Sequence, residues 1–187
     1  MDPRLVALAL AAVALAAVAL LALVLRRRRA SRHRRTSRQR TSRQRASHQR
    51  GTNYPGDYTG RVDVRYAPSR DGRPDPGEVV WTWVPFEEDH ARGKDRPVLL
   101  IGHDGPWLLG IQLSSKDHHL DTADEARRGR HWLGIGAGPW DARRRPSAVR
   151  LDRIVRVDPD AVRREGAMLG RRKFDEVSRS LSALHHW

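Results

Sequence analysis

The chain has 187 residues, a formal net charge of +14 and no cysteine. This length allows one domain of ordinary size, or a smaller domain with appended segments. The absence of cysteine excludes disulfide bonds and metal sites built from thiolates.

The positive charge is concentrated in one segment. Residues 26–50 contain twelve arginines and no acidic residue, while Asp2 and Arg4 cancel in the segment before it. Residues 51–187 then hold 23 Lys and Arg against 21 Asp and Glu, a net charge of only +2. The high isoelectric point therefore describes a basic segment attached to a nearly neutral domain, not a basic nucleic-acid-binding domain.

Residues 5–25 form an unbroken run of Leu, Val and Ala. As a helix, these 21 residues would be about 31 Å long, which matches the hydrocarbon core of a bilayer. A cleavable signal peptide would carry its positive charges before the apolar run, but here residues 26–29 follow it. The pattern predicts a single-pass membrane anchor over residues 1–25, with the N-terminus outside and the C-terminal domain cytoplasmic. A wrongly assigned start codon is the alternative.

The next segment predicts a disordered linker over residues 26–76. Residues 36–50 repeat the unit TSRQR, TSRQR, ASHQR. No large apolar residue lies between Arg26 and Arg50, so this stretch cannot offset the entropy lost on ordering. Gly, Pro, Asp and Tyr dominate the rest of the linker. We expect the arginines to bind anionic membrane lipids; RNA capture and a solvated spacer are the alternatives.

Short apolar runs separated by Gly, Pro and Asp predict a mainly β domain over residues 77–187. The runs are residues 78–86, 98–101, 107–113, 148–151 and 154–157. Such short strands, with no long helix between them, favour a small antiparallel barrel. The glycines of residues 134–139 predict a turn, and the apolar spacing in residues 171–184 predicts an amphipathic C-terminal helix.

Three stretches of this domain, GEVVWTWVPFEEDHARGKDRPVLLIG, LLGIQLSSK and VRLDRIVRVD, resemble the PemK/MazF-like toxins of type II toxin–antitoxin modules. The opening block, GEVVWTWVPFEEDHARGKDRPVLLIG, has an acidic residue, an apolar strand, a loop, and then Arg-Pro before a second apolar strand. LLGIQLSSK is similar to the family strand that ends in a hydroxyl residue, although this chain has serine where threonine is more usual. VRLDRIVRVD is similar to the late strand region, and the resemblance covers residues 77–184.

The resemblance implies a Src-homology-3-like barrel with a C-terminal α-helix, usually a homodimer. It also implies a metal-independent endoribonuclease that cuts single-stranded RNA, including mRNA. A cognate antitoxin would neutralise the toxin by laying an acidic disordered segment across the active groove.

The same resemblance assigns catalytic positions to Arg96 and Ser114. A metal-independent cut uses the adjacent 2′-OH as nucleophile, and a fixed guanidinium would stabilise the charge that builds up on the phosphate oxygens. The alternative is that Arg96 forms a structural ion pair at the barrel rim. The candidate partners for that pair are Asp95, Glu87, Glu88 and Asp89.

Further residues are weaker candidates. Ser115, Asp117 and His118 follow Ser114 closely and could assist, since arginine is a poor general base. Candidate RNA-binding residues, chosen for stacking or positive charge, are Trp81, Trp83, Lys94 and Lys116. We expect no metal and no cofactor, because cysteine is absent and the histidine pairs have poor chelating spacing.

Two other functions stay open at this stage. The domain could be a non-catalytic barrel that binds nucleic acid or a protein partner near the membrane. It could also be a passenger on a structural membrane-surface protein, with the basic segment as the active part.

Overall fold

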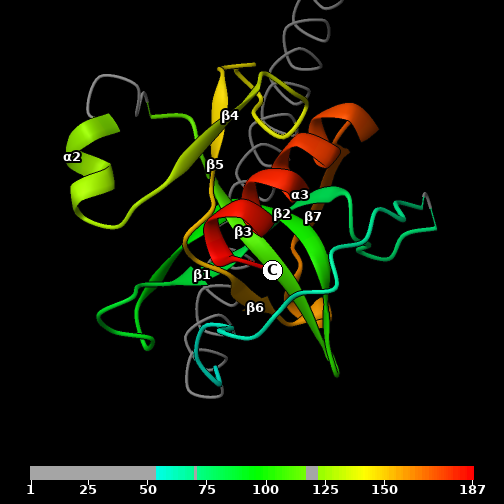
Figure 1. Cartoon of the computed structure of the whole chain (residues 1–187). Coiled ribbons are helices and arrows are strands. Elements are labelled where there is room, and N and C mark those ends of the chain that lie inside the picture. The colour runs from blue at the N-terminus through cyan, green and yellow to red at the C-terminus, as the bar shows by residue number, and fades with distance from the viewer. Residues whose placement is uncertain (1–53, 70, 117–121) are drawn as a thin grey trace, which may run out of the picture. The chain divides into compact units, whose positions relative to one another are not determined.

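The computed structural model describes residues 54–69, 71–116 and 122–187 (Figure 1). The chain divides into two compact units, Met1–Ala46 and Ser47–Trp187, and every described residue belongs to the second. The predicted anchor and the arginine-rich part of the predicted linker lie outside the described residues. Within the described ranges, no helix is long and apolar enough to cross a membrane.

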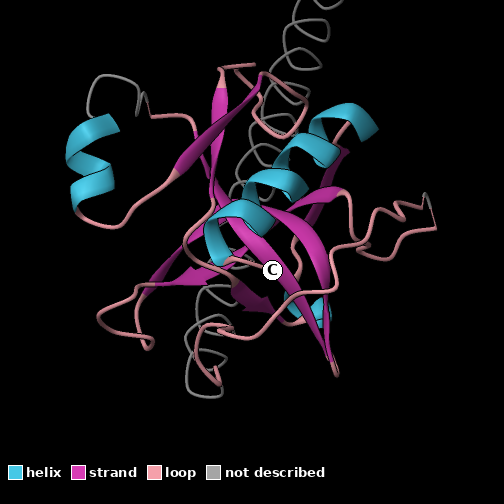
Figure 2. Cartoon of the chain, viewed as in Figure 1, coloured by secondary structure: helices cyan, strands magenta, loops and turns pink. Residues whose placement is uncertain are grey.

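The regular secondary structure of the second unit is mainly strand (Figure 2). They are β1 (Glu78–Pro85), β2 (Gly93–Asp104), β3 (Trp107–Ser114), β4 (Trp132–Gly136), β5 (Ser147–Arg150), β6 (Val155–Val157) and β7 (Arg164–Met168). The helices are α2 (Thr122–Arg127), the 3₁₀ turn η2 (Pro159–Ala161) and α3 (Arg171–His185). The five predicted strands and the terminal helix are confirmed.

The strands form one antiparallel sheet in the order β4-β5-β3-β2-β1-β7. Strand β3 pairs with β2 along one edge and divides its other edge between β6 and β5. Bulges in β1, β2 and β4 add local twist, and the sheet curls (Figure 1). Within the described residues β4 and β7 do not pair with each other. The mainly β fold predicted from the sequence is confirmed, and the predicted antiparallel barrel takes the form of a curled half-barrel.

Two hydrophobic clusters cover the two faces of the sheet. Strand alternation puts Leu99 in the cluster under α3 and its neighbours Val98 and Leu100 in the cluster on the opposite face. Helix α3 buries three residues at helical spacing, Phe174, Val177 and Leu181. The face that carries Val98 continues into polar residues, and the candidate site lies there.

Two strands were missed from sequence for different reasons. β4 contains Gly134 and Gly136, and the glycines predicted a turn; instead they form a bulged edge strand that pairs with β5. The sequence of β7, REGAM, has no apolar alternation. This segment is a strand because it pairs with β1, which lies far from it in the sequence. The local sequence pattern does not reveal such a pairing.

Residues 54–69, expected to be linker, pack on the domain. Val62 is 5 % exposed within the cluster under α3. Tyr58 N donates to Ile154 O at 2.8 Å, and Arg65 N donates to Ile101 O at 3.0 Å. The Tyr66 hydroxyl donates to Leu169 O at 2.8 Å. The burial of these apolar and aromatic side chains offsets the entropy lost when this turn-rich segment becomes ordered. The folded domain therefore includes residues well before 77.

We expect Tyr66→Phe to lower the free energy of unfolding by about 1 kcal/mol, because it leaves the part-buried Leu169 carbonyl without its donor. Tyr58→Phe is the matched control: its hydroxyl donates to Arg61 O at an exposed position, so its loss should be under about 0.5 kcal/mol. Urea unfolding of both variants measures the difference. Equal losses would mean that the Tyr66 contact does not hold this segment.

Candidate functional site

Arg96 and Ser114 lie on the same face of neighbouring strands. The β2–β3 ladder ends at the pair Val98 and Gln112. Arg96 precedes Val98 by two residues and Ser114 follows Gln112 by two, so alternation points all four side chains to one face. The predicted catalytic pair is thus brought to the same end of the same sheet face.

Strand β5 adds a second arginine to this face. Ser114 pairs with Ala148, and Arg150 lies two residues further along β5. Alternation therefore places Arg150 on the face that carries Ser114. Its side chain is only 8 % exposed, which is rare for an arginine unless carboxylates compensate its charge.

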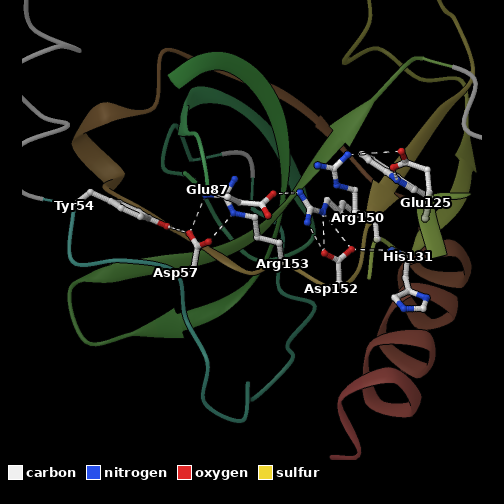
Figure 3. Close-up of polar contacts among 10 residues, drawn as sticks. Tyr54, Asp57, Glu87, Glu125, His131, Arg150, Asp152 and Arg153 are labelled. Carbon is white, nitrogen blue, oxygen red and sulfur yellow. Dashed lines mark hydrogen bonds and ion pairs between the residues drawn. The ribbon is translucent and has the colours of Figure 1, made fainter. Parts of the chain in front are cut away.

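Two carboxylates hold Arg150 in place (Figure 3). Arg150 Nη2 and Nε donate to Asp152 Oδ2 at 2.6 and 2.9 Å, and Nη1 donates to Glu87. Asp152 also accepts a hydrogen bond from the backbone N of His131 at 2.8 Å. Burial lowers the pKa of Arg150, but the hydrogen bonds from Asp152 and Glu87 outweigh it and leave the pKa above its ordinary value. This guanidinium is a fixed, permanent charge.

A third arginine, Arg153, is held by Asp57. Its side chain is 6 % exposed, and Nε and Nη2 donate to the two carboxylate oxygens of Asp57 at 2.6 and 3.0 Å. Figure 3 shows the forked contact, with the Tyr54 side chain on the other side of Asp57. We call Arg96, Arg150 and Arg153 the arginine cluster.

Arg96 differs from the other two members of the cluster. It is half-buried, yet no carboxylate of the described residues lies within 4.0 Å of its guanidinium. Burial lowers the pKa of Arg96, and the positive charges of Arg153 and Arg150 lower it further. The side chain therefore stands among like charges without a described counter-ion, an arrangement that an anionic ligand would relieve.

The ion-pair alternative for Arg96 is not supported by the described contacts. Asp95 pairs instead with Arg163 at 2.9 Å, and Glu87 pairs with Arg150. Asp89 accepts a hydrogen bond from the backbone N of Ala91 at 3.0 Å, inside its own loop. Glu88, the fourth candidate, is exposed.

The residues after Ser114 border a cavity of about 750 Å³. Ser114 Oγ accepts a hydrogen bond from Lys116 N at 3.1 Å, so the chain turns directly after the strand. Ser115 and Lys116 line the cavity together with parts of α2, β4 and β5. Asp117 and His118 lie outside the described residues.

The predicted stacking tryptophans are not brought to the arginine cluster. Trp81 and Trp83 alternate with Thr82, the partner of Arg96, and so face the other side of β1. Trp81 Nε1 donates to Trp140 O at 2.9 Å. Lys94 shares the face of Arg96, and its ammonium lies 5.6 Å from the centre of the Phe86 ring. A role for these residues in RNA binding stays a prediction.

Sequence reasoning missed Arg150, Arg153 and Gln112 as site residues. The signal was present, since both arginines stand among apolar residues that are buried, and Gln112 interrupts an apolar strand at 7 % exposure. Buried polar side chains need partners, and that requirement marks them. Among the described residues, no group of three or more His, Asp or Glu is placed to hold a metal ion.

Comparison with known proteins adds the family. A model described as "PemK-like, MazF-like toxin of type II toxin-antitoxin system" matches residues 75–185. A MazE-MazF crystal structure from Deinococcus radiodurans is 17% identical, covering 61% of this chain and 96% of that chain, with a TM-score of 0.43. A MazF structure from the same organism is 18% identical, covering 63% and 100%, with a TM-score of 0.42. Mycobacterium tuberculosis toxin MazF-mt6 is 12% identical, covering 58% and 96%, with a TM-score of 0.39.

No curated protein matches the chain. The family match spans more than half of the 187 residues and contains every strand that the structure describes, helix α3 and the whole arginine cluster. The chain therefore belongs to the family of PemK-like, MazF-like toxins of type II toxin–antitoxin systems.

Proposed function

We propose that this toxin is a metal-independent endoribonuclease that cuts single-stranded RNA by attack of a 2′-OH on the adjacent phosphate. One observation carries the proposal. Arg96 is half-buried on the face of Ser114, near two arginines that carboxylates hold, and no described carboxylate neutralises it. A phosphate is the ligand that this arrangement fits best.

The reaction forms one bond and breaks one. The 2′ oxygen attacks phosphorus, the bond from phosphorus to the 5′ oxygen breaks, and the products carry a 2′,3′-cyclic phosphate and a 5′-OH. Extra negative charge builds up on the non-bridging oxygens in the transition state. The Arg96 fork would bind two of these oxygens, and Ser114 would donate a hydrogen bond to a phosphate oxygen.

The proton of the 2′-OH needs an acceptor that the arginine cluster does not supply. Arginine remains protonated, and the carboxylates nearest to the cluster are engaged with Arg150 and Arg153. The pKa of Asp57 illustrates this: burial raises it, but the hydrogen bonds from Arg153 and Tyr54 outweigh burial and lower it below its ordinary value. Asp117 and His118 remain the candidates for this role.

The partners follow from the same reading and are proposals as well. An acidic antitoxin segment would place carboxylates on Arg96 and so compete with RNA, and the MazE-MazF structure from Deinococcus radiodurans is a relative solved with its partner. We expect a homodimer, as the family resemblance implies. A membrane anchor in residues 1–25 and lipid binding by the arginines up to residue 50 rest on the sequence alone.

The full-length chain, incubated with a long single-stranded RNA in EDTA, tests the proposed function. We expect specific cuts that leave 2′,3′-cyclic phosphate and 5′-OH ends, and no cutting of the same RNA carrying 2′-O-methyl groups, which lack the nucleophile. RNA binding without cleavage by folded protein would favour the non-catalytic binding module instead.

A further inference from the structure

Residues 54–58 precede the family-matched region, yet they contact the arginine cluster. The family match begins at residue 75, and Asp57 makes the forked contact with Arg153 across 96 positions of sequence. A carboxylate from outside the matched domain therefore fixes the guanidinium of a residue inside it.

Asp57 is itself held from two sides. The Tyr54 hydroxyl donates to Asp57 Oδ1 at 2.5 Å. The backbone oxygens of Gly56 and Asp57 accept from Arg156 Nη1 at 2.8 and 3.1 Å, and Arg156 Nε donates to Asp104 Oδ2 at 2.7 Å. The contact with Arg153 thus belongs to a connected network and is not an isolated surface pair.

The same segment reaches the loop between β1 and β2. The ring of Tyr54 meets His90 edge to face, with centroids 5.1 Å apart and an interplanar angle of 82°. That loop also carries Glu87, which holds Arg150. Residues 54–58 therefore supply the carboxylate that holds Arg153. Through His90 they also contact the loop that carries Glu87.

We propose that Asp57 and Tyr54 are positioning residues of the ribonuclease site, which hold Arg153 and the β1–β2 loop around the phosphate that Arg96 binds. This inference rests on the proposed function. The two residues act through Arg153 and do not touch the substrate. Because they orient the Arg153 guanidinium, their loss should weaken the stabilisation of the transition state more than the binding of RNA.

The matched pair Asp57→Asn and Asp63→Asn tests this inference in the full-length chain. Both changes remove one carboxylate from the same segment, but Asp63 pairs only with the exposed Arg65 in the contacts described. With the RNA that wild type cuts, Asp57→Asn should lower kcat about 10-fold with KM changed less than about 2-fold. Asp63→Asn should behave as wild type.

Tyr54→Phe is a milder second variant that still tests the inference if Asp57→Asn does not fold. It removes one hydroxyl and keeps the ring against His90, and it should lower kcat about 3-fold. The unfolding temperature of each variant is measured as well, and the rates are measured well below it. If wild type cuts and both Asp57→Asn and Tyr54→Phe cut as fast while folded, the inference is overturned and the proposed function stands. If wild type leaves the RNA intact, both fall.

Discussion

Replacing Arg96 with alanine should lower kcat/KM for RNA cleavage about 10³-fold while leaving the fold intact. The change removes the one guanidinium of the cluster without a described carboxylate partner, and a preorganised donor to a charged transition state is worth about 10² to 10³ in rate or more. Stability should hold or rise slightly, because Arg96 is half-buried beside two like charges. Initial rates on the RNA that wild type cuts measure the effect, with thermal unfolding beside them.

Two further variants sharpen this prediction. Arg96→Lys keeps the charge but loses the fork, so it should recover only a small part of the rate. Arg172→Ala removes an exposed arginine from α3, on the opposite face of the sheet, and should cut as wild type. If Arg96→Ala retained wild-type rates, the guanidinium would not face the scissile phosphate, and the proposed mechanism would be lost.

Replacing Arg150 with alanine should lower the free energy of unfolding by about 3 kcal/mol. The side chain is 8 % exposed and satisfies both Asp152, itself 16 % exposed, and Glu87. Removing one partner of a buried ion pair costs about 3–5 kcal/mol because it leaves the other charge uncompensated. We take the lower end, since Glu87 is 45 % exposed and can be rehydrated. Urea unfolding at neutral pH measures the loss.

Arg65→Ala is the control for Arg150→Ala. Arg65 pairs with Asp63 at side-chain exposures of 67 % and 71 %, and exposed pairs contribute about 0–1 kcal/mol. A loss at Arg150 no larger than that at Arg65 would contradict the view that the Glu87–Arg150–Asp152 contacts are a structural support of the site.

The fold was largely predictable because its signals are local. The run Val98–Ile101 needs burial on both sides, and the spacing of Phe174, Val177 and Leu181 defines one face of a helix. What local pattern did not contain is pairing: β4 and β7 are strands because β5 and β1 lie beside them. The closure of a barrel is likewise decided between its end strands and not within any one of them.

The candidate site was predictable only in part. Arg96 and Ser114 followed from a resemblance to known toxins, and the register of β2 and β3 then places them on one face. Arg150 reaches the same face through the pairing of β5, and contacts with Glu87 and Asp57 hold Arg150 and Arg153. Asp57 stood in a turn-rich stretch whose composition indicates linker, so nothing in its neighbourhood identified it as a partner for a buried arginine.

The placement of Asp57 has a practical consequence for how such a domain is produced in the laboratory. A fragment trimmed to the boundaries of the family match would begin at residue 75 and keep the seven strands described above and helix α3. It would also leave the nearly inaccessible guanidinium of Arg153 without its carboxylate. Weak activity or poor yield from that fragment would then reflect the missing segment and not a property of the whole domain. A fragment that keeps Asp57 and its partner Tyr54 has to begin at or before residue 54.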